Sequence, residues 1–120
     1  SSTRGAEMAR IYKILPRAEW RAAQAAGAFA GSAVDLADGY IHFSTAAQAT
    51  ETARRHFAGQ SDLVVLEVEA DDLGGALKWE PSRAGDLFPH LYGRLPVAAV
   101  RAVTEAPLGA DGVPELGDLA

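Results

Sequence analysis

Cysteine is absent from this 120-residue chain. Its absence excludes a disulfide framework, a thiolate nucleophile and a cysteine-based zinc site. No apolar run approaches the ~18 residues that a membrane-spanning helix requires, and no signal-peptide pattern opens the chain. There is also no run of lysine and arginine, so the electrostatic footprint of a nucleic-acid-binding protein is missing. We therefore expect a cytoplasmic protein that binds neither membranes nor nucleic acids.

The length fits one domain with a modest core. The first seven residues show no hydrophobic period, and we expect them to be an expression remnant, with Met8 as the natural start. The formal net charge is −5, and residues 107–120 carry −3 of it without a balancing lysine or arginine. Because this segment also contains three glycines, we expect a flexible acidic tail after a single globular domain of residues 8–106.

Hydrophobic periodicity predicts an α+β fold. Alternating apolar residues predict strands at residues 10–15, 40–44, 62–70, 77–80 and 101–106. Helices are predicted at residues 17–26 and from residue 46 to about 58, the second with a capping box formed by Thr45 and Gln48. A loop with a short turn at residues 34–37 is predicted at residues 28–39, a turn at residues 71–75, a polar loop at residues 81–86 and a helical turn at residues 96–100. A regular central strand at residues 88–91 is excluded because Pro89 cannot donate to a ladder.

The segment from Tyr40 to Thr45 (YIHFST) is the strongest candidate for a site. Strand alternation places Tyr40, His42 and Ser44 on one face, close to the N–H groups that open the next helix and that favour anions. His42 could orient a ligand hydroxyl or carry a proton, and Ser44 or Thr45 could add a hydroxyl. The alternative is structural, with Thr45 as a helix cap and His42 as a hydrogen-bonded structural residue.

A second polar segment extends from Lys78 to Arg94, where loops dense in charged residues often carry binding groups. Glu80 could act as a base or hold a ribose hydroxyl, and Arg83 could bind a phosphate or carboxylate. His90 and Tyr92 complete the candidate set. The alternative is a surface ion pair between Glu80 and Arg83, which would contribute little.

Several familiar motifs are missing. The three histidines, His42, His56 and His90, share no metal-ligand spacing, so we expect no metal. No glycine-rich phosphate loop is present, and no Gly-x-Ser-x-Gly elbow supports a serine nucleophile.

Five blocks of sequence occur in a specific order: IYKIL, EW, GYIHFST, LKWEP and LFPHLYG. In this order and spacing they resemble the small bacterial proteins grouped as domain of unknown function 952. The resemblance covers nearly all of residues 10–106. The family label carries no activity of its own.

That family is grouped by fold with ADP-ribosyltransferases. The resemblance therefore implies a pair of small, split β-sheets with flanking helices. It also implies NAD as a cofactor, with His42 as the residue from an early strand that orients the ribose. Tyr92 or Tyr40 would stack on nicotinamide, and Glu80 or the later Glu105 would be the catalytic glutamate. Kinship of fold does not transfer activity by itself.

These observations lead to one hypothesis with two rivals. We expect a single pocket for NAD, ADP-ribose or a phosphorylated relative, and whether it is catalytic stays open. One wall would comprise Tyr40, His42 and Ser44, and the other Glu80, Arg83, His90 and Tyr92. An enzyme would transfer or hydrolyse at the nicotinamide–ribose bond, with Glu80 stabilising positive charge on the ribose. The rivals are a non-catalytic binding or interaction module, and a protein in which His42 and His90 are buried structural residues.

Overall fold

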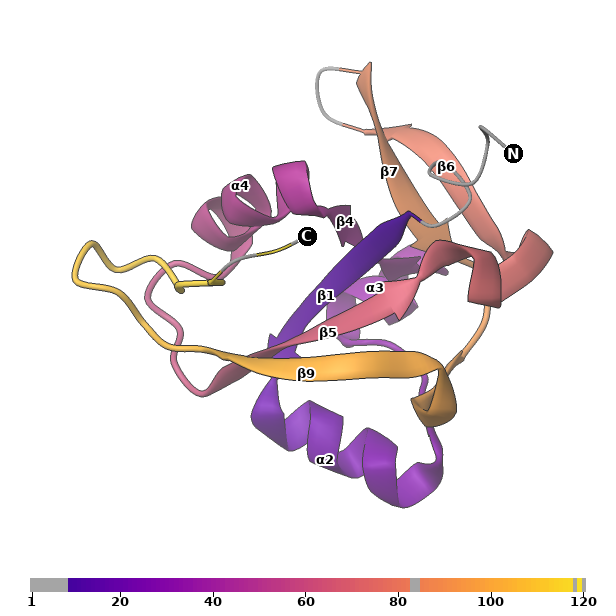
Figure 1. Cartoon of the computed structure of the whole chain (residues 1–120), viewed down its shortest axis with the longest axis horizontal. Helices are drawn as coiled ribbons and strands as arrows, with labels where there is room; N and C mark the ends of the chain where they lie inside the picture. Colours follow the sequence, from indigo (N-terminus) through magenta and orange to yellow (C-terminus); the bar gives the residue numbers. More distant parts are fainter. Residues whose placement is uncertain (1–8, 83–84, 118, 120) are drawn as a thin grey trace.

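A four-stranded antiparallel sheet forms the centre of the fold (Figure 1), in a computed structural model that describes residues 9–82, 85–117 and 119. Its strand order is β4-β1-β5-β9. The strands are β1 (Arg10–Pro16), β4 (Ser44–Thr45), β5 (Leu63–Glu69) and β9 (Val100–Ala106). The strand predicted at residues 62–70 is confirmed as β5, which lies between β1 and β9. The expected expression remnant, Met8 and the candidate residue Arg83 lie outside the described residues.

Two smaller antiparallel sheets accompany the central one. In the first, β7 (Asp86–Leu91) lies between β3 (Ile41–His42) and β6 (Leu77–Ser82). In the second, β2 (Ala28–Phe29) pairs with β8 (Leu95–Pro96). Figure 1 shows the β6–β7 hairpin rising from one edge of the central sheet. The α+β class is therefore confirmed.

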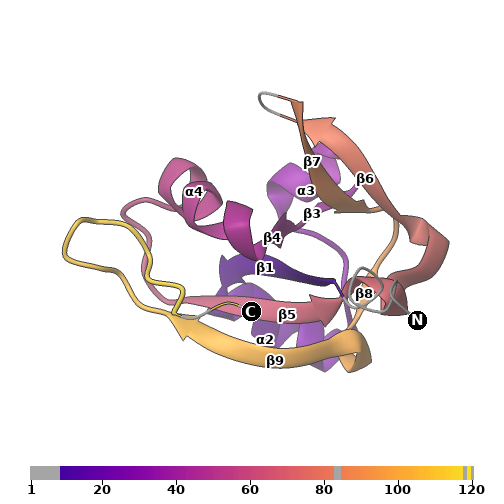
Figure 2. The same ribbon diagram turned by 45° about the horizontal axis from the view of Figure 1, so that its top comes forward.

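Helices cover both faces of the central sheet (Figure 2). They are α2 (Arg17–Ala26), α3 (Ala33–Asp38) and α4 (Ala46–His56), with 3-10 turns η1 (Ala70–Ala76) and η3 (Val97–Ala99). Trp20 and Ala23 of α2 pack in one apolar cluster with alternate residues of β1 and β5. Ala49 and Ala53 of α4 pack in a second cluster with the intervening residues of β1 and β5. The alternation of apolar residues in β1 and β5 thus builds two cores, one on each side of the sheet.

The expected loop at residues 28–39 is corrected by the structure, which places strand β2 and helix α3 there. The carboxylate of Asp35 accepts a hydrogen bond from the backbone N–H of Ser32 at 2.9 Å, which fixes the start of α3. Gly39, in the left-handed conformation at φ 90°, ends it. A helix of six residues is too short to show a hydrophobic period, so the pattern missed it.

The expected strand at residues 40–44 is broken into two. Ile41 and His42 pair with β7 in the smaller sheet, whereas Ser44 and Thr45 pair with β1 in the central sheet. Between them, the N–H of Phe43 donates to the carbonyl of Pro89 at 3.0 Å. The chain therefore crosses from one sheet to the other at Phe43, directly beside the candidate residues His42 and Ser44.

The exclusion of a central strand at Pro89 was wrong, because β7 is the middle strand of its sheet. In an antiparallel ladder the N–H and C=O of one residue face the same neighbour. The carbonyl of Pro89 faces Phe43, so its missing N–H also faces the side where β3 has ended. The expected turn at residues 71–75 lies within η1, and the expected loop at residues 81–86 is corrected, because parts of it extend β6 and β7.

The acidic segment after β9 folds back instead of extending away, which corrects the expectation of a loose tail for its described residues. Leu116 is buried against the apolar cluster of α4, and Val113 and Leu119 pack beside it. The N–H of Gly59 donates to the carbonyl of Gly112 at 2.7 Å. Apolar residues at three-residue spacing thus tie this segment to the second core.

Across the part of the chain that the structure describes, no helix has the length and apolar character needed to cross a membrane.

Candidate functional site

A cleft of about 670 Å³ opens between the central sheet, α3, α4 and the β6–β7 hairpin. Four of the residues predicted from two separate segments line it: Tyr40, His42, Ser44 and His90. Other side chains on its wall include Lys13, Glu19, Asp38, Thr52 and Phe88. The predicted residues Thr45, Glu80 and Tyr92 do not line it.

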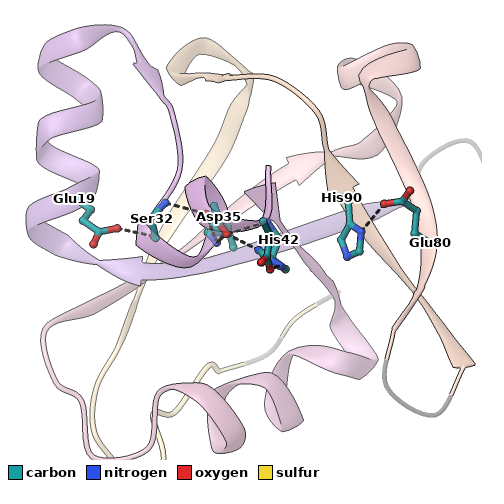
Figure 3. A network of polar contacts seen from close by, with 8 residues as sticks. Glu19, Ser32, Asp35, His42, Glu80 and His90 are labelled. Atoms are coloured by element: carbon teal, nitrogen blue, oxygen red, sulfur yellow. Dashed lines mark hydrogen bonds and ion pairs between the residues drawn. The ribbon is translucent and has the colours of Figure 1, made fainter. Parts of the chain in front are cut away.

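His42 contacts two carboxylates of α3, those of Asp35 and Asp38. Figure 3 shows its ring beside Asp35. Its Nδ1 is 2.6 Å from Oδ1 of Asp35, and its Nε2 is 2.9 Å from Oδ2 of Asp38. An ionised carboxylate can only accept hydrogen bonds. Both contacts are therefore hydrogen bonds at the same time only when the imidazole carries both protons. About a third of the His42 side chain remains exposed, at 32%.

Asp35 is the buried centre of this arrangement, with only 1% of its side chain exposed. Lys13 Nζ lies 2.9 Å from its Oδ2, and the backbone N–H of His42 donates to its Oδ1 at 3.2 Å. Burial opposes ionisation of Asp35, but the hydrogen bond from His42 and the charge and hydrogen bond of Lys13 outweigh it and lower the pKa to about 2. Burial lowers the pKa of Lys13, and its attraction to Asp35 opposes that shift.

His90 forms a second pair of imidazole and carboxylate. The ring is buried, and its Nδ1 is 2.7 Å from Oε1 of Glu80. The hydroxyl of Tyr92 donates to the same oxygen at 2.7 Å. The hydrogen bond from His90, and then that from Tyr92, lowers the pKa of Glu80. The hydrogen bond to Glu80 in turn raises the pKa of Tyr92 to about 12.

The ring of Tyr40 joins the two pairs. It stacks on His90 with ring centroids 4.1 Å apart, and its centroid lies 4.7 Å from that of His42 and 5.2 Å from that of Tyr92. The rings of His42 and His90, which face each other in the β3–β7 register, are 5.5 Å apart and edge-on. Burial raises the pKa of Tyr40, and the negative charges of Asp38 and Glu80 add to the effect.

The hydroxyls of the predicted segment have different surroundings. Ser44 is buried, and its Oγ lies 2.9 Å from Oγ1 of Thr52 on α4. Thr45 is the N-cap of α4: its hydroxyl accepts from the N–H of Gln48 at 3.3 Å, and its own N–H donates to Oε1 of Gln48 at 3.0 Å. The capping box is therefore confirmed, which agrees with the structural alternative for Thr45.

Sequence reasoning missed Lys13, Asp35 and Asp38. Lys13 lies on the same face of β1 as the core residues Ile11 and Leu15, and no local pattern pairs it with a carboxylate 22 residues away. Asp35 follows Ser32 by three residues, and this helix-start signal could have been found. Asp38 is one helical turn before His42 in sequence, but the intervening Gly39 ends the helix.

The charges that line the cleft are mainly negative. Lys13 is the only lysine or arginine on its described wall, and Asp35 neutralises it. Asp38 pairs with His42, and Oε1 of Glu19 accepts a hydrogen bond from the Ser32 hydroxyl at 2.6 Å. Among the described residues, no group of three or more histidine, aspartate or glutamate side chains could hold a metal ion.

The fold and site define a small α+β domain with a cleft where two histidine–carboxylate pairs meet, at the boundary between two sheets. The chain belongs to the family described as "Protein of unknown function (DUF952)", which it matches over residues 14–103. The predicted family is thereby confirmed.

Solved structures of one bacterial protein are similar to this chain. The crystal structure of protein CC0527 from Caulobacter crescentus has 60% sequence identity and a TM-score of 0.89, covering 91% of this chain and 96% of that one. The solution NMR structure of CC0527 has 61% identity and a TM-score of 0.82, covering 92% and 97%. No curated protein matches this chain. The comparisons establish family and fold, and the kinship with ADP-ribosyltransferases stays a prediction.

Proposed function

We propose that the cleft binds a nucleotide-type ligand: NAD, ADP-ribose or a related ribosyl compound. The observation that carries the proposal is the convergence of Tyr40, His42, Ser44 and His90 on one cleft of about 670 Å³. These residues come from two segments some fifty residues apart, each of which the sequence had singled out. The volume lies in the ordinary range for small-molecule sites.

The chemistry of the wall supports a ligand with an aromatic ring and hydroxyl groups. Tyr40 and Phe88 offer aromatic surface for a base, and His42 offers a hydrogen bond to a ribose hydroxyl. Near the carboxylates of Glu19 and Asp38, the cleft favours a neutral or positively charged ring, such as oxidised nicotinamide, over a phosphate.

The position of Glu80 bears on whether the site is catalytic. An ADP-ribosyl transfer or NAD glycohydrolase reaction would use a carboxylate close to the ribose. Glu80 is outside the cleft wall, and one of its oxygens already accepts from both His90 and Tyr92. In this arrangement Glu80 acts through His90, as a positioning residue. This observation favours a second candidate function: a binding module that keeps the cleft without the reaction.

A calorimetric and thermal-shift screen against NAD, ADP-ribose, nucleotides and sugar phosphates tests the proposal. A ligand present at 100 times its Kd should raise the free energy of unfolding by ~2.7 kcal/mol. His42→Ala and Tyr40→Leu should each remove most of that gain, because both side chains lie on the cleft. Trp79→Leu is the matched control, since Trp79 is an exposed aromatic residue outside the cleft wall and should bind like wild type.

Two outcomes would separate the candidate functions. Turnover of NAD that is lost in both His42→Ala and Glu80→Gln indicates an enzyme, whereas tight binding without turnover by the wild type indicates a binding module. A flat screen across the whole panel would contradict the proposal.

A further inference from the structure

The two histidines of the cleft are held in the same way but have different surroundings. Nδ1 of His42 is 2.6 Å from Asp35, and Nδ1 of His90 is 2.7 Å from Glu80. Each carboxylate therefore accepts a hydrogen bond from Nδ1–H, and whether each ring is neutral or charged depends on the proton at Nε2. Nε2 of His42 meets a second carboxylate, Asp38, at 2.9 Å. Among the described residues, Nε2 of His90 has no hydrogen-bond partner.

These contacts favour opposite charge states. Two carboxylates at hydrogen-bond distance stabilise the doubly protonated, charged form of His42. They do so although the positive charge of Lys13 lies on the other side of Asp35. On His90, Nδ1–H donates to Glu80, and the same carboxylate oxygen also accepts a hydrogen bond from the hydroxyl of Tyr92. The ring is buried against Tyr40 and lies 5.5 Å from His42, so a second proton would place another positive charge beside the first.

We propose that His42 and His90 form a donor–acceptor pair, in which a charged His42 presents Nε2–H and a neutral His90 presents an unprotonated Nε2. This inference deepens the proposed function by naming the group that the cleft recognises. Two neighbouring hydroxyls of a ribose match the pair, because one accepts from His42 in competition with Asp38 and the other donates to His90. Asp38 can release this hydrogen bond when a ligand binds, since 45% of its side chain is exposed and water can solvate the carboxylate.

The charge states can be measured on the whole protein without any ligand. Long-range proton–nitrogen NMR spectra distinguish protonated from unprotonated imidazole nitrogens. At pH 7 we expect His42 to show two protonated nitrogens, and His90 to show a protonated Nδ1 with an unprotonated Nε2. An unprotonated nitrogen on His42, or two protonated nitrogens on His90, would overturn the proposal.

Asp38→Ala provides the variant arm of the experiment. Removing this exposed carboxylate should lower the fraction of doubly protonated His42 at pH 7 and leave the His90 signals unchanged. Asp71→Ala removes an exposed carboxylate far from both rings in sequence and should leave His42 as in wild type. If Asp38→Ala leaves His42 unchanged, the second carboxylate does not set its state and the assignment fails.

The recognition of hydroxyls has its own test. NAD should bind at least about tenfold more tightly than an analogue that lacks the hydroxyls of the nicotinamide ribose, because the analogue leaves Nε2 of both rings without their ligand partners. Equal binding would overturn the ribose assignment. Failure of NAD to bind would count against the proposed function, and the NMR result would still decide the donor–acceptor pair.

Discussion

At the scale of single residues, Asp35 connects the core to the cleft. Its buried carboxylate accepts from Lys13, from the ring and backbone of His42, and from the backbone of Ser32. Lys13 lies in β1 and His42 in β3, and Ser32 is the N-cap of α3. One side chain thus fixes the start of a helix, neutralises a buried cation and orients an imidazole.

Removing the negative charge of Asp35 should lower the free energy of unfolding. Asp35→Asn leaves the buried Lys13 ammonium without its counter-ion, and we expect the free energy of unfolding at pH 7 to fall by about 3–5 kcal/mol. Lys13→Met combined with Asp35→Asn should recover a large part of this loss, because no unpaired charge remains. Urea denaturation of the wild type, both single variants and the double variant measures the coupling. Additive losses would contradict a coupled ion pair.

The low pKa of Asp35 predicts a specific dependence on acid. The group ionises at about 2 in the folded state and at 3.8 in the reference state, so its contribution is complete above pH 4 and is lost as the pH falls through 2. We expect the wild type to lose about 2 kcal/mol from this group between pH 5 and pH 2. Asp35→Asn should lack this component, which denaturation curves at each pH would show. An unchanged acid dependence in the variant would contradict the assignment.

At the scale of elements, the site depends on where helices begin. Thr45 and Gln48 cap α4, and the side-chain amide of Gln48 also donates to the carbonyl of Leu87 in β7 at 2.8 Å. The cap therefore ties the helix that carries Thr52 to the strand that carries His90.

Thr45→Ala should lower the free energy of unfolding by about 1 kcal/mol, since the N–H of Gln48 loses its acceptor. Thr104→Ala, at an exposed position of β9, is a matched control in which no helix cap is removed. Thermal denaturation of both variants compares them. Equal, small effects would show that the capping box contributes little to α4.

Local signals in the sequence were sufficient for the longer helices and strands, but not for β2, α3 or the contacts of the site. The capping box, the stop at Gly27 and the central strand at residues 63–69 follow from the properties of neighbouring residues, and they were predictable. Lys13 and Asp35 meet only after β1 and α3 have docked, and nothing near either residue indicates its partner. The crossing at Phe43 could not be predicted for the same reason. One extended segment pairs with two different sheets, and strand pairing depends on residues far away in the sequence.

At the scale of the whole molecule, two separate cores stabilise the sheet, and the segment after β9 completes one of them. Leu116 lies in the cluster that α4 forms with β1 and β5, although it is ten residues beyond the end of β9. The segment therefore belongs to the folded domain in its described part.

Leu116→Ala should lower the free energy of unfolding by about 2–3 kcal/mol. The variant loses buried apolar surface and leaves a cavity that the surrounding side chains fill only in part. Leu108→Ala is the matched control in the same segment, because Leu108 is exposed and should change stability by less than about 1 kcal/mol. Chemical denaturation distinguishes the two. Similar small losses would indicate that the segment does not contribute to the second core.

Pro89 has a consequence for how faithfully the site is assembled. A slip of β3 against β7 by one residue would pair Pro89 with a residue that needs its N–H, and it would turn side chains to the opposite face. In the observed register Pro89 lies opposite Phe43, just after β3 ends, so neither residue pair of the β3–β7 ladder needs its N–H. Pro89 therefore disfavours a shifted pairing, in which His90 would no longer lie opposite His42.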